Sequence, residues 1–526
     1  MRSTRLAVTV VTGLALFVPN FSHSSPGSTQ APETDTAATD PSYQELPLRQ
    51  GPGTTSVAAT KPFGMVGVTW PTRPNSGQVV VKVRVQRNGV WSAWEQLPVE
   101  DEHGPDTAIP EGQERSGTDP FWVGNADGID ASLTTRDGTT ISDAKVVLIQ
   151  PGILATDANP PSSVAATQTD ARAPYPVPAI ISRRGWGADE RLRSHNGAAC
   201  ARPKYTSTVQ AAFVHHTADR NDYTRAQAPA MIRAMYAYHV KSRGWCDLGY
   251  NFLVDKFGRT FEGRYGGIQL PVLGAHTGAF NSNSFGVSLI GNFEKAKPTR
   301  SMLEATARII AWKLDANYRS PQATVVLDGR RLHTVSGHRD TKATACPGNN
   351  LYSQLGWLKQ RADALMGKSV STEIYRFAQQ LGGYRKVGQP FWGEHPTRTG
   401  RATYFGARDV YWSPATGAHS VQGGFRGRFR QYGPDGLLGM PVAEQRNGRP
   451  SGRVQAFRYG AIYWSRRTGM HAVNGLISRK YGSFGADRSR LGLPISEPFR
   501  VTGGVQQKFQ HGRLTLSFRT QKVYLT

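Results

Sequence analysis

The sequence is poor in cysteine and in acidic residues, and it holds only one long apolar run. Three cysteines among 526 residues are too few to hold a chain of this length together by disulfides. With 63 Lys/Arg against 38 Asp/Glu, the formal net charge is +25, which favours anionic partners over cationic ones. Beyond the N-terminus no apolar run reaches the roughly 20 residues of a membrane-spanning helix, which argues against a transmembrane protein.

The one apolar run, residues 6–19, follows Arg2 and Arg5 and precedes a polar stretch. It is too short to span a bilayer, and its basic N-terminal flank is typical of a secretory signal. We therefore predict a signal peptide over residues 1–25, with a short membrane anchor as the alternative. A secreted basic chain with no transmembrane segment after signal removal meets anionic wall polymers or lipid rather than nucleic acid, so we expect no nucleic acid partner.

An odd number of cysteines in an exported protein requires an explanation for the unpaired thiol. One arrangement accounts for all three cysteines: a disulfide between Cys200 and Cys246, with Cys346 bound to a metal ion. Spacing alone does not fix the pairing, so this arrangement is a hypothesis.

A chain of 526 residues is too long for one hydrophobic core, and its composition divides it into segments. Two stretches rich in Ser, Thr, Ala and Pro predict linkers, and three other segments have regular apolar patterns. In order, we predict a signal peptide (1–25), a disordered linker (26–60), a β-rich accessory domain (61–153), a second linker (154–179), a central domain (180–367) and a repeat domain (371–526).

The first two folded segments differ in their apolar periodicity. Residues 78–86 alternate apolar and polar side chains and precede a turn of Asn88 and Gly89, which predicts a β-hairpin in an accessory β-sandwich. In the central segment, residues 211–214 form a short apolar run, as in a buried strand, whereas residues 229–239 have helical spacing. This mixture predicts an α/β domain with a mixed central sheet and flanking helices.

The last segment repeats with a period of 52 residues, which separates Phe405, Phe457 and Phe509 and also Trp412 and Trp464. Three copies predict a β-rich repeat array in which each unit buries its face on its neighbours. The aromatic residues could stack on sugars, although core packing is the commoner use of the phenylalanines. The segment contains 24 Lys/Arg and 7 Asp/Glu, a net charge of +17 that suits anionic cell-wall polymers.

Three distant segments contain the residue types of one zinc site. His215 ends an apolar run, His338 lies in a Ser-Gly-His-Arg-Asp sequence, and Cys346 precedes a Pro-Gly pair. Zinc binds neutral imidazoles and thiolates, and three protein ligands leave an open position, as in catalytic sites. Because neighbouring side chains of a strand point to opposite faces, one of His215 and His216 can bind the metal while the other points elsewhere. The set predicts a zinc hydrolase.

A rival interpretation is cysteine nucleophile catalysis, in which His338 and Asp340 activate Cys346. This interpretation leaves His215 without a role. A chelator distinguishes the two, since a thiol hydrolase should survive the removal of zinc.

The central segment, residues 183–357, resembles the peptidoglycan recognition proteins and the related zinc-dependent N-acetylmuramoyl-L-alanine amidases. The resemblance rests on several motifs in order: Trp186-Gly187-Ala188, Phe213-Val214-His215-His216-Thr217, Gly244-Trp245-Cys246-Asp247-Leu248-Gly249-Tyr250-Asn251-Phe252, Glu262-Gly263-Arg264, Gly274-Ala275-His276-Thr277, Gly286-Val287-Ser288, and Gly337-His338-Arg339-Asp340 through Cys346-Pro347-Gly348. The C-terminal repeats resemble LGFP repeats, which occur on cell-wall-associated proteins of actinobacteria.

The resemblance implies a role for each matched residue. The implied zinc ligands are His215, His338 and Cys346, and the implied catalytic residues are Tyr250 and Thr344. Thr344 stands where some phage relatives carry lysine, so it offers only a neutral hydrogen bond. The positions that line the family's peptidoglycan groove are His216, His239, Arg243, His276 and Asn281.

The resemblance therefore implies a secreted zinc amidase that cuts the bond between N-acetylmuramic acid and L-alanine, with basic LGFP repeats that direct it to the wall. The alternative is a non-catalytic protein that binds peptidoglycan or anchors itself in the wall. Mass analysis of digested sacculi distinguishes these, because an amidase releases intact stem peptides and a binding protein releases none.

Overall fold

The computed structural model describes residues 42–48, 55–57, 60–72, 79–99, 115–138, 141–163, 173–367, 371–449 and 451–526. The predicted signal peptide lies outside these residues. The chain divides into two compact units, Ala37–Ala418 and a unit that contains His419–Thr526. In the described residues no helix is both long and apolar enough to cross a membrane.

The N-terminal segment is a β-sandwich of two five-stranded sheets. One sheet has the order β1-β10-β3-β7 with β8 on β3, and the other has the order β2-β9-β4-β5 with β6 on β4. The apolar side chains of β4 alternate inward, as the sequence predicted. The strands are β1 (Ser42–Pro47), β2 (Thr55–Val57), β3 (Phe63–Pro71), β4 (Val79–Arg87), β5 (Val90–Trp91), β6 (Glu95–Leu97), β7 (Arg115–Gly117), β8 (Phe121–Ala126), β9 (Gly128–Thr135) and β10 (Lys145–Gln150).

The sandwich begins earlier in the chain than predicted, because β1 and β2 lie in the segment assigned to a disordered linker. β1 is an edge strand that pairs along its whole length with β10. An edge strand is held by backbone hydrogen bonds and needs few apolar residues, so the composition of this segment gave no strand signal.

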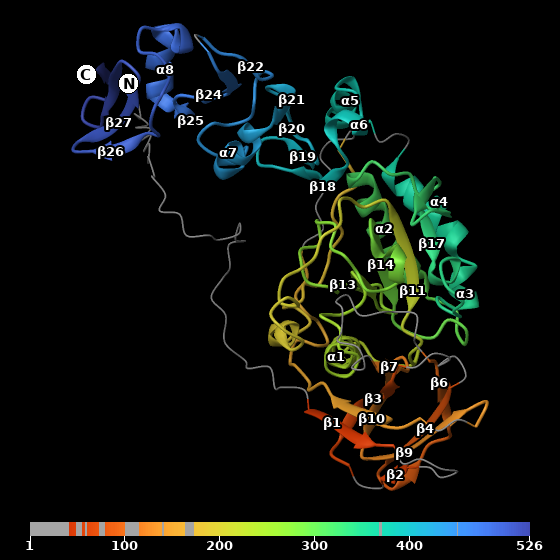
Figure 1. The fold of residues 1–526 in the computed structure, drawn as a ribbon. Helices are drawn as coiled ribbons and strands as arrows, with labels where there is room; N and C mark the ends of the chain where they lie inside the picture. The colour runs from red at the N-terminus through yellow and green to blue at the C-terminus, as the bar shows by residue number, and fades with distance from the viewer. Residues whose placement is uncertain are drawn as a thin grey trace, which may run out of the picture. The chain divides into compact units, whose positions relative to one another are not determined.

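The central segment is an α/β domain around a five-stranded mixed sheet, in the order β13-β12-β14-β11-β17. β11 lies between two parallel partners, and only β13 is antiparallel to its neighbour. Helices α2 and α4 pack on one face of the sheet, and α1 on the other (Figure 1). Together with the sandwich and the β-rich repeats, this domain confirms the predicted multidomain fold.

The elements of the central domain are the strands β11 (Ala211–His216), β12 (Phe252–Val254), β13 (Thr260–Glu262), β14 (Ser284–Leu289), β15 (Thr324–Leu327), β16 (Arg330–His333) and β17 (Val335–Gly337), the α-helices α1 (Gln227–Ala237), α2 (Arg300–Ala316), α3 (Asn349–Tyr352) and α4 (Leu355–Met366), the short 3-10 helices η2 (Glu190–Ser194), η4 (Gly278–Asn281) and η5 (His338–Asp340), and the π-helix η3 (Tyr238–Ser242).

The sandwich and the central domain share one core through α1 and η3. α1 is buried on all sides because it lies between the central sheet and strands β3 and β10 (Figure 1). The Tyr238 hydroxyl, at the end of α1, donates to the Thr118 carbonyl (2.9 Å). A Cβ atom at Gly67 would lie 2.4 Å from the Tyr238 ring, so glycine is required where β3 meets this side chain.

Part of the predicted second linker is packed against the central domain. Asp157 and Arg233, both buried, form a bidentate ion pair with two contacts of 2.7 Å. Arg233 also donates to the Trp186 carbonyl (2.9 Å) and to the Gly152 carbonyl (3.0 Å). This network attaches the segment that follows the sandwich, from Gly152 to Asp157, to helix α1.

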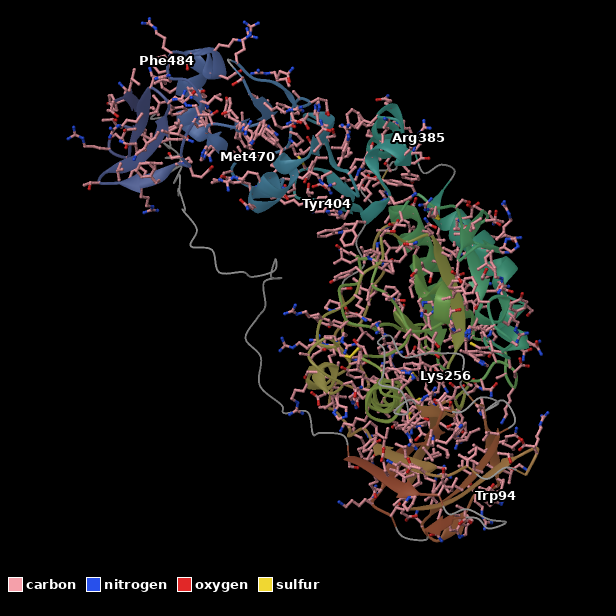
Figure 2. The ribbon with its side chains drawn as sticks, viewed as in Figure 1. Trp94, Lys256, Arg385, Tyr404, Met470 and Phe484 are labelled. Carbon is pink, nitrogen blue, oxygen red and sulfur yellow. A yellow bond between two sulfur atoms is a disulfide. The ribbon has the colours of Figure 1, made fainter. Side chains whose placement is uncertain are left out.

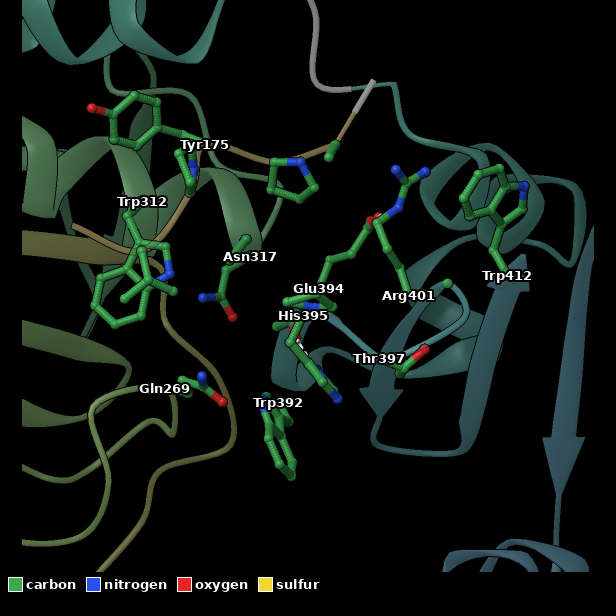
Figure 3. A pocket seen from close by; sticks show the side chains of 18 of the residues that line it. Tyr175, Gln269, Trp312, Asn317, Trp392, Glu394, His395, Thr397, Arg401 and Trp412 are labelled. Atoms are coloured by element: carbon green, nitrogen blue, oxygen red, sulfur yellow. Dashed lines mark hydrogen bonds and ion pairs between the residues drawn. The ribbon is translucent and has the colours of Figure 1, made fainter. Parts of the chain in front are cut away.

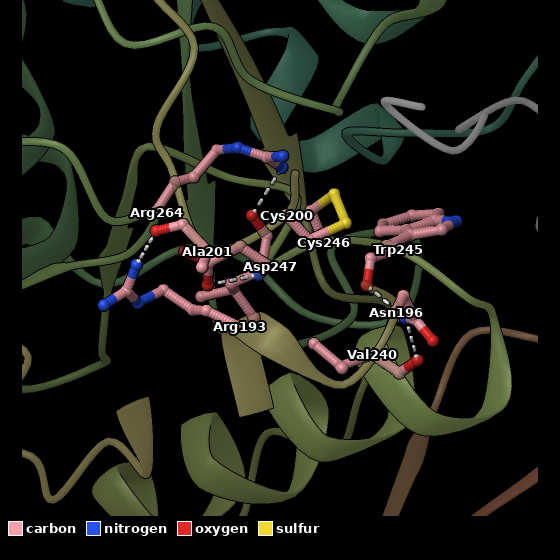
Figure 4. Close-up of a disulfide and its surroundings, with 10 residues drawn as sticks. Arg193, Asn196, Cys200, Ala201, Val240, Trp245, Cys246, Asp247 and Arg264 are labelled. Carbon is pink, nitrogen blue, oxygen red and sulfur yellow. Dashed lines mark hydrogen bonds between the residues drawn. A yellow bond between two sulfur atoms is a disulfide. The ribbon is translucent and has the colours of Figure 1, made fainter. Parts of the chain in front are cut away.

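Cys200 and Cys246 form a disulfide, which confirms the hypothesis for these two cysteines, and Cys346 is a free buried thiol. Figure 4 shows that the Asn196 amide beside the disulfide donates to the carbonyls of Val240 and Trp245, each at 2.8 Å. The disulfide thus ties the loop after η2 to the segment that follows η3.

Removing this disulfide is expected to destabilise the central domain. The bond closes a loop of 46 residues, for which the chain-entropy account gives about 4 kcal/mol. A Cys200→Ser/Cys246→Ser variant should therefore have a lower melting temperature in calorimetry, while the Cys346 thiol remains. A melting temperature equal to that of the wild-type protein would contradict this expectation.

The first repeat belongs to the same compact unit as the central domain. It packs on the end of α2 through Tyr318, whose ring stacks against Phe405 with centroids 6.2 Å apart. Its elements are α5 (Glu373–Gln380), α6 (Tyr384–Val387), β18 (Pro390–Pro396), β19 (Arg401–Phe405) and β20 (Arg408–Ser413); β21 (Gly417–Gln422) spans the boundary between the two units.

The second unit contains two further four-stranded sheets, β22-β23-β24-β25 and β26-β27-β28-β29. The repeated phenylalanines 405, 457 and 509 are buried, which confirms their prediction as core residues. Exposed aromatic side chains also occur, such as Phe484 in this unit and Trp94 in the sandwich (Figure 2). The elements are α7 (Gly424–Tyr432), β22 (Arg446–Asn447), β23 (Arg453–Phe457), β24 (Gly460–Ser465), β25 (Gly469–Asn474), α8 (Gly475–Ser483), η6 (Ala486–Arg488), β26 (Phe499–Val501), β27 (Gly504–Phe509), β28 (Gly512–Ser517) and β29 (Val523–Leu525).

Each repeat contains a glutamate at a corresponding position near its start, and its carboxylate accepts a hydrogen bond from residues earlier in the chain. Glu394 accepts from the Tyr318 hydroxyl (2.8 Å), Glu444 from the Ser420 amide (2.8 Å) and Glu497 from the Ala472 amide (3.2 Å). In the first repeat, a tyrosine of the central domain thus supplies the donor that a strand residue supplies in the later repeats.

Candidate metal centre

The sheet topology brings the three predicted zinc ligands together. His215 lies near the end of the central strand β11, His338 directly follows the neighbouring strand β17, and Cys346 lies in the loop before α3. One ligand atom from each residue lies within 4.8 Å of the other two, and all three side chains are buried. Because β11 and β17 run parallel, their C-terminal ends meet at one edge of the sheet, where the site forms.

The loop that contains Cys346 is fixed on both sides of the thiol. The backbone amide of His216 points to Cys346 Sγ (3.4 Å), and a donor in this position stabilises a thiolate. The peptide bond between Cys346 and Pro347 is cis. Gly348 follows with φ +88°, and a Cβ atom there would lie 2.4 Å from the Phe293 carbonyl carbon, so only glycine fits.

The donor set fits zinc. Two imidazoles and one thiol are the ligand types that zinc prefers, and three of them correspond to the catalytic rather than the structural class of site. The Nδ1 atom of His215 lies 3.7 Å from Cys346 Sγ, so this nitrogen is the one that faces the thiol. The group thus consists of two imidazole rings and one sulfur atom, and it includes no carboxylate among the described residues.

His276 contacts His215 and does not lie in an open groove. Its Nδ1 atom is 3.1 Å from His215 Nε2, the nitrogen on the far side of the ring from the thiol. His276 is fully buried, and Cβ atoms at Gly274 and Gly286 would lie 2.4 and 2.6 Å from its ring, so the cavity for this imidazole is built by two glycines. This geometry fixes the orientation of His215.

His216 points to the opposite side of β11, as its position in the strand predicted. Its Nδ1 atom accepts a hydrogen bond from the Phe293 amide (3.2 Å). Burial lowers the pKa of His216 to about 3, so the imidazole is neutral at physiological pH. In this structure His216 supports the loop beside the site and is almost wholly buried.

The two predicted catalytic side chains lie near the site in different environments. Tyr250 is buried, with its ring centroid 5.4 Å from that of His215. Thr344 is half-exposed, and its hydroxyl accepts a hydrogen bond from the Cys346 amide (3.2 Å). Thr344 therefore also helps to shape the loop of the thiol ligand.

The remaining predicted groove residues make structural contacts. His239 Nδ1 accepts from the Gly249 amide (3.3 Å), and Arg243 Nε donates to the carbonyl of Arg115 in the sandwich (3.2 Å). His239 and Arg243 are buried. The Asn281 side chain accepts from the amides of residues 276 and 277, both at 2.9 Å, and so holds the backbone of His276.

Glu294 and Asp340 hold the loops around the metal group, and of these two residues sequence reasoning missed Glu294. Glu294 accepts from the Asn349 amide (2.9 Å) and pairs with Arg339 (3.0 Å). Asp340 accepts from the Gly337 amide (2.8 Å) and from the Tyr352 hydroxyl (2.6 Å). A glutamate in a loop gives no sequence signal for such a role, whereas Asp340 is part of the motif around His338.

Comparison with known proteins places these features in families. Residues 205–349 match the family described as N-acetylmuramoyl-L-alanine amidase, and residues 388–435 and 438–489 match the LGFP repeat. Residues 23–174 match the family described as Rv3811 N-terminal galactose-binding domain-like. The third predicted repeat lies outside the matched ranges, although it forms the same kind of four-stranded sheet.

Similar proteins cover the central domain. Peptidoglycan-recognition protein SC2 of Drosophila simulans is 32% identical over 176 residues, which are 34% of this chain and 84% of that protein. Peptidoglycan recognition protein 1 of Bos indicus is 34% identical over 179 residues, 33% of this chain and 80% of that protein. A structure of a Drosophila PGRP-LB mutant in complex with tracheal cytotoxin is 26% identical, covering 36% of this chain and 96% of that one, with a TM-score of 0.28. The chain therefore belongs to the family of peptidoglycan recognition proteins and N-acetylmuramoyl-L-alanine amidases, and it carries C-terminal LGFP repeats.

Proposed function

We propose that the chain is a secreted, zinc-dependent amidase that hydrolyses the bond between N-acetylmuramic acid and L-alanine in peptidoglycan. The observation that carries this proposal is the buried group of His215, His338 and Cys346, within 4.8 Å of one another in the segment that matches the amidase family. A protein that only bound peptidoglycan would have no need of a complete ligand set with an open fourth position.

His215, His338 and Cys346 would hold the zinc ion, which when bound would supply Lewis-acid polarisation of the scissile carbonyl and a water of lowered pKa. The chain's own residues supply the rest of the chemistry. The hydroxyl of Tyr250 donates a hydrogen bond to the oxygen that becomes negative in the tetrahedral intermediate, and Thr344 offers a second, neutral donor. His276 holds the His215 ring in the orientation that directs Nδ1 to the site.

The proposal includes a location in the cell wall, which the composition of the chain supports. A signal peptide over residues 1–25 would export it, and the disulfide between Cys200 and Cys246 suits an oxidising compartment. The excess of positive charge in residues 371–526 would draw the protein to anionic wall polymers by long-range attraction. Peptidoglycan is the proposed substrate at that surface.

Digestion of purified sacculi tests this function. We expect mass spectrometry to detect free stem peptides that begin with L-alanine, and we expect a chelator to stop their release. Binding to sacculi without release would favour the non-catalytic alternative. Release that continues in the chelator would favour the cysteine nucleophile.

Tyr250→Phe should lower turnover on muropeptides while zinc stays bound. Loss of one preorganised donor to the oxyanion reduces kcat by about 10²–10³-fold. A control is Tyr265→Phe, because Tyr265 is exposed and lies outside the metal group. The role of Tyr250 would be disproved by a variant with wild-type kcat and full zinc content.

His276→Ala should weaken zinc binding by about 10–100-fold, because the second nitrogen of His215 loses its partner. Competition with a coloured chelator measures this affinity without a turnover assay. His276→Gln, which retains a hydrogen-bonding side chain, should recover part of the affinity. Equal affinities in the alanine variant and the wild-type protein would show that His276 does not position the ligand.

A further inference from the structure

A cavity of about 670 Å³ lies where the first repeat meets the end of α2. Its volume falls within the range of about 300–1,000 Å³ that is typical of small-molecule sites. All of its lining residues belong to the compact unit Ala37–Ala418, and none is a member of the metal group. Figure 3 shows that Trp312, Gln269 and Asn317 come from the central domain, and that Trp392, His395 and Trp412 come from the repeat.

The apolar surface of the cavity consists of flat rings from both sides. Trp312 and Tyr175 line it on the side of the central domain, and Trp392 and Trp412 on the side of the repeat. The ring of His395 stacks on Trp392, with centroids 4.2 Å apart and planes inclined by 18°. Such rigid planar groups offer contact area at a low cost in conformational entropy, and they pack well against the C–H faces of sugar rings.

Four charged groups of the cavity, Lys313, Glu373, Glu394 and Arg401, are paired with one another or with the backbone. Arg401 Nη2 pairs with Glu373 (2.6 Å), and Arg401 Nε pairs with Glu394 (2.8 Å). The ammonium group of Lys313 donates to the carbonyls of Ile268 (2.9 Å) and Leu270 (3.2 Å). Because Arg401 and Lys313 already have partners, an anionic ligand would have to compete with these contacts. The exposed Arg398 also lines the cavity, so an anionic probe belongs in the test.

Neutral polar groups provide the remaining contacts. The Gln269 side chain forms no hydrogen bond within the described part of the chain, so both atoms of its amide can serve a ligand. His395 Nδ1 lies 2.8 Å from the Gly393 carbonyl, which makes this nitrogen the donor and leaves Nε2 as an acceptor. Burial lowers the pKa of His395 to about 4 and keeps the ring neutral at pH 7.

We propose that this cavity binds a neutral saccharide, with aromatic and amide groups contributed jointly by the central domain and the first repeat. The hydroxyl groups of a sugar match the amides and the imidazole acceptor, and its C–H faces match the rings. The site does not depend on zinc or on amidase activity, since it shares no residue with the metal group.

The test is calorimetric titration of the full chain with two neutral probes, a trisaccharide of N-acetylglucosamine and a galactose trisaccharide, and with a glycerol phosphate trimer as the anionic probe. We expect at least one neutral probe to bind. Gln269→Ala and Trp412→Ala, one from each side of the cavity, should each weaken this binding by about tenfold. Which neutral probe binds indicates whether an acetamido group is required.

Two matched variants serve as controls. Trp464 occupies the position in the second repeat that corresponds to Trp412, and Gln322 is an exposed glutamine outside the cavity. Trp464→Ala and Gln322→Ala should leave the affinity unchanged. Gln269→Ala removes no hydrogen bond within the described residues, so its effect cannot be attributed to unfolding. The proposal is overturned if neither neutral probe binds, if only the glycerol phosphate trimer binds, or if the controls weaken binding as much as the cavity variants do.

Discussion

Cys346→Ser is expected to abolish the release of stem peptides from purified sacculi. Serine nearly matches cysteine in size but is not ionised at neutral pH, so the site loses its thiolate ligand and with it zinc. The fold should persist, because the thiol makes only weak sulfur contacts, with the backbone of His216 and with His215 Nδ1. Mass spectrometry of the digest, with zinc content measured on the same sample, checks both parts of the expectation.

The control for this variant is the Cys200→Ser/Cys246→Ser double variant, which removes the other two cysteines and leaves the metal group intact. It should retain zinc and turnover below its lowered melting temperature. Full turnover by a zinc-free Cys346→Ser variant would refute the proposed mechanism. Loss of activity in the double variant with zinc still bound would show that the effect is not specific to Cys346.

The second large effect is expected from Asp157→Ala, which should lower the free energy of unfolding by about 3–5 kcal/mol. The substitution leaves the Arg233 guanidinium buried without its carboxylate partner, and an uncompensated buried charge is costly. Denaturant unfolding followed by tryptophan fluorescence measures the loss.

An exposed ion pair provides the comparison. Arg220 and Asp222 form a similar contact, but the Asp222 side chain is 66% exposed, so Asp222→Ala should cost less than about 1 kcal/mol. A joint replacement of Asp157 by leucine and Arg233 by methionine should recover most of the stability, because it removes both charges together. If Asp157→Ala costs no more than Asp222→Ala, the buried pair does not hold the linker to α1.

The sequence was sufficient to predict the parts of the site that follow from local pattern. The apolar run before His215 predicted a central strand, and the helical spacing of residues 229–239 predicted a helix that the structure places at Gln227–Ala237. The ligands in loops, His338 and Cys346, were predicted from the resemblance of their motifs to a known family. These loops depend on glycine and proline at fixed positions, which makes the motifs recognisable.

The surroundings of the site could not be predicted in the same way. His239 and Arg243, the predicted groove residues, are buried, and Arg243 donates to the carbonyl of Arg115 in the sandwich. This contact joins residues far apart in the chain, so local pattern gives no sign of it. The contact of His276 with His215 depends on two glycines in different segments. The burial of Asp157 could not be predicted from composition either, because the segment around it has the residue content of a linker.

The repeated glutamates have a consequence for how the C-terminal array can change in length. Each carboxylate takes at least one donor from residues earlier in the chain, and for Glu394 these donors include Tyr318 of the central domain. No glutamate of this set depends on a donor that comes after its own repeat. Evolution, or an engineer, can therefore shorten or extend the array at its C-terminal end while the attachment of the first repeat to the enzyme stays the same.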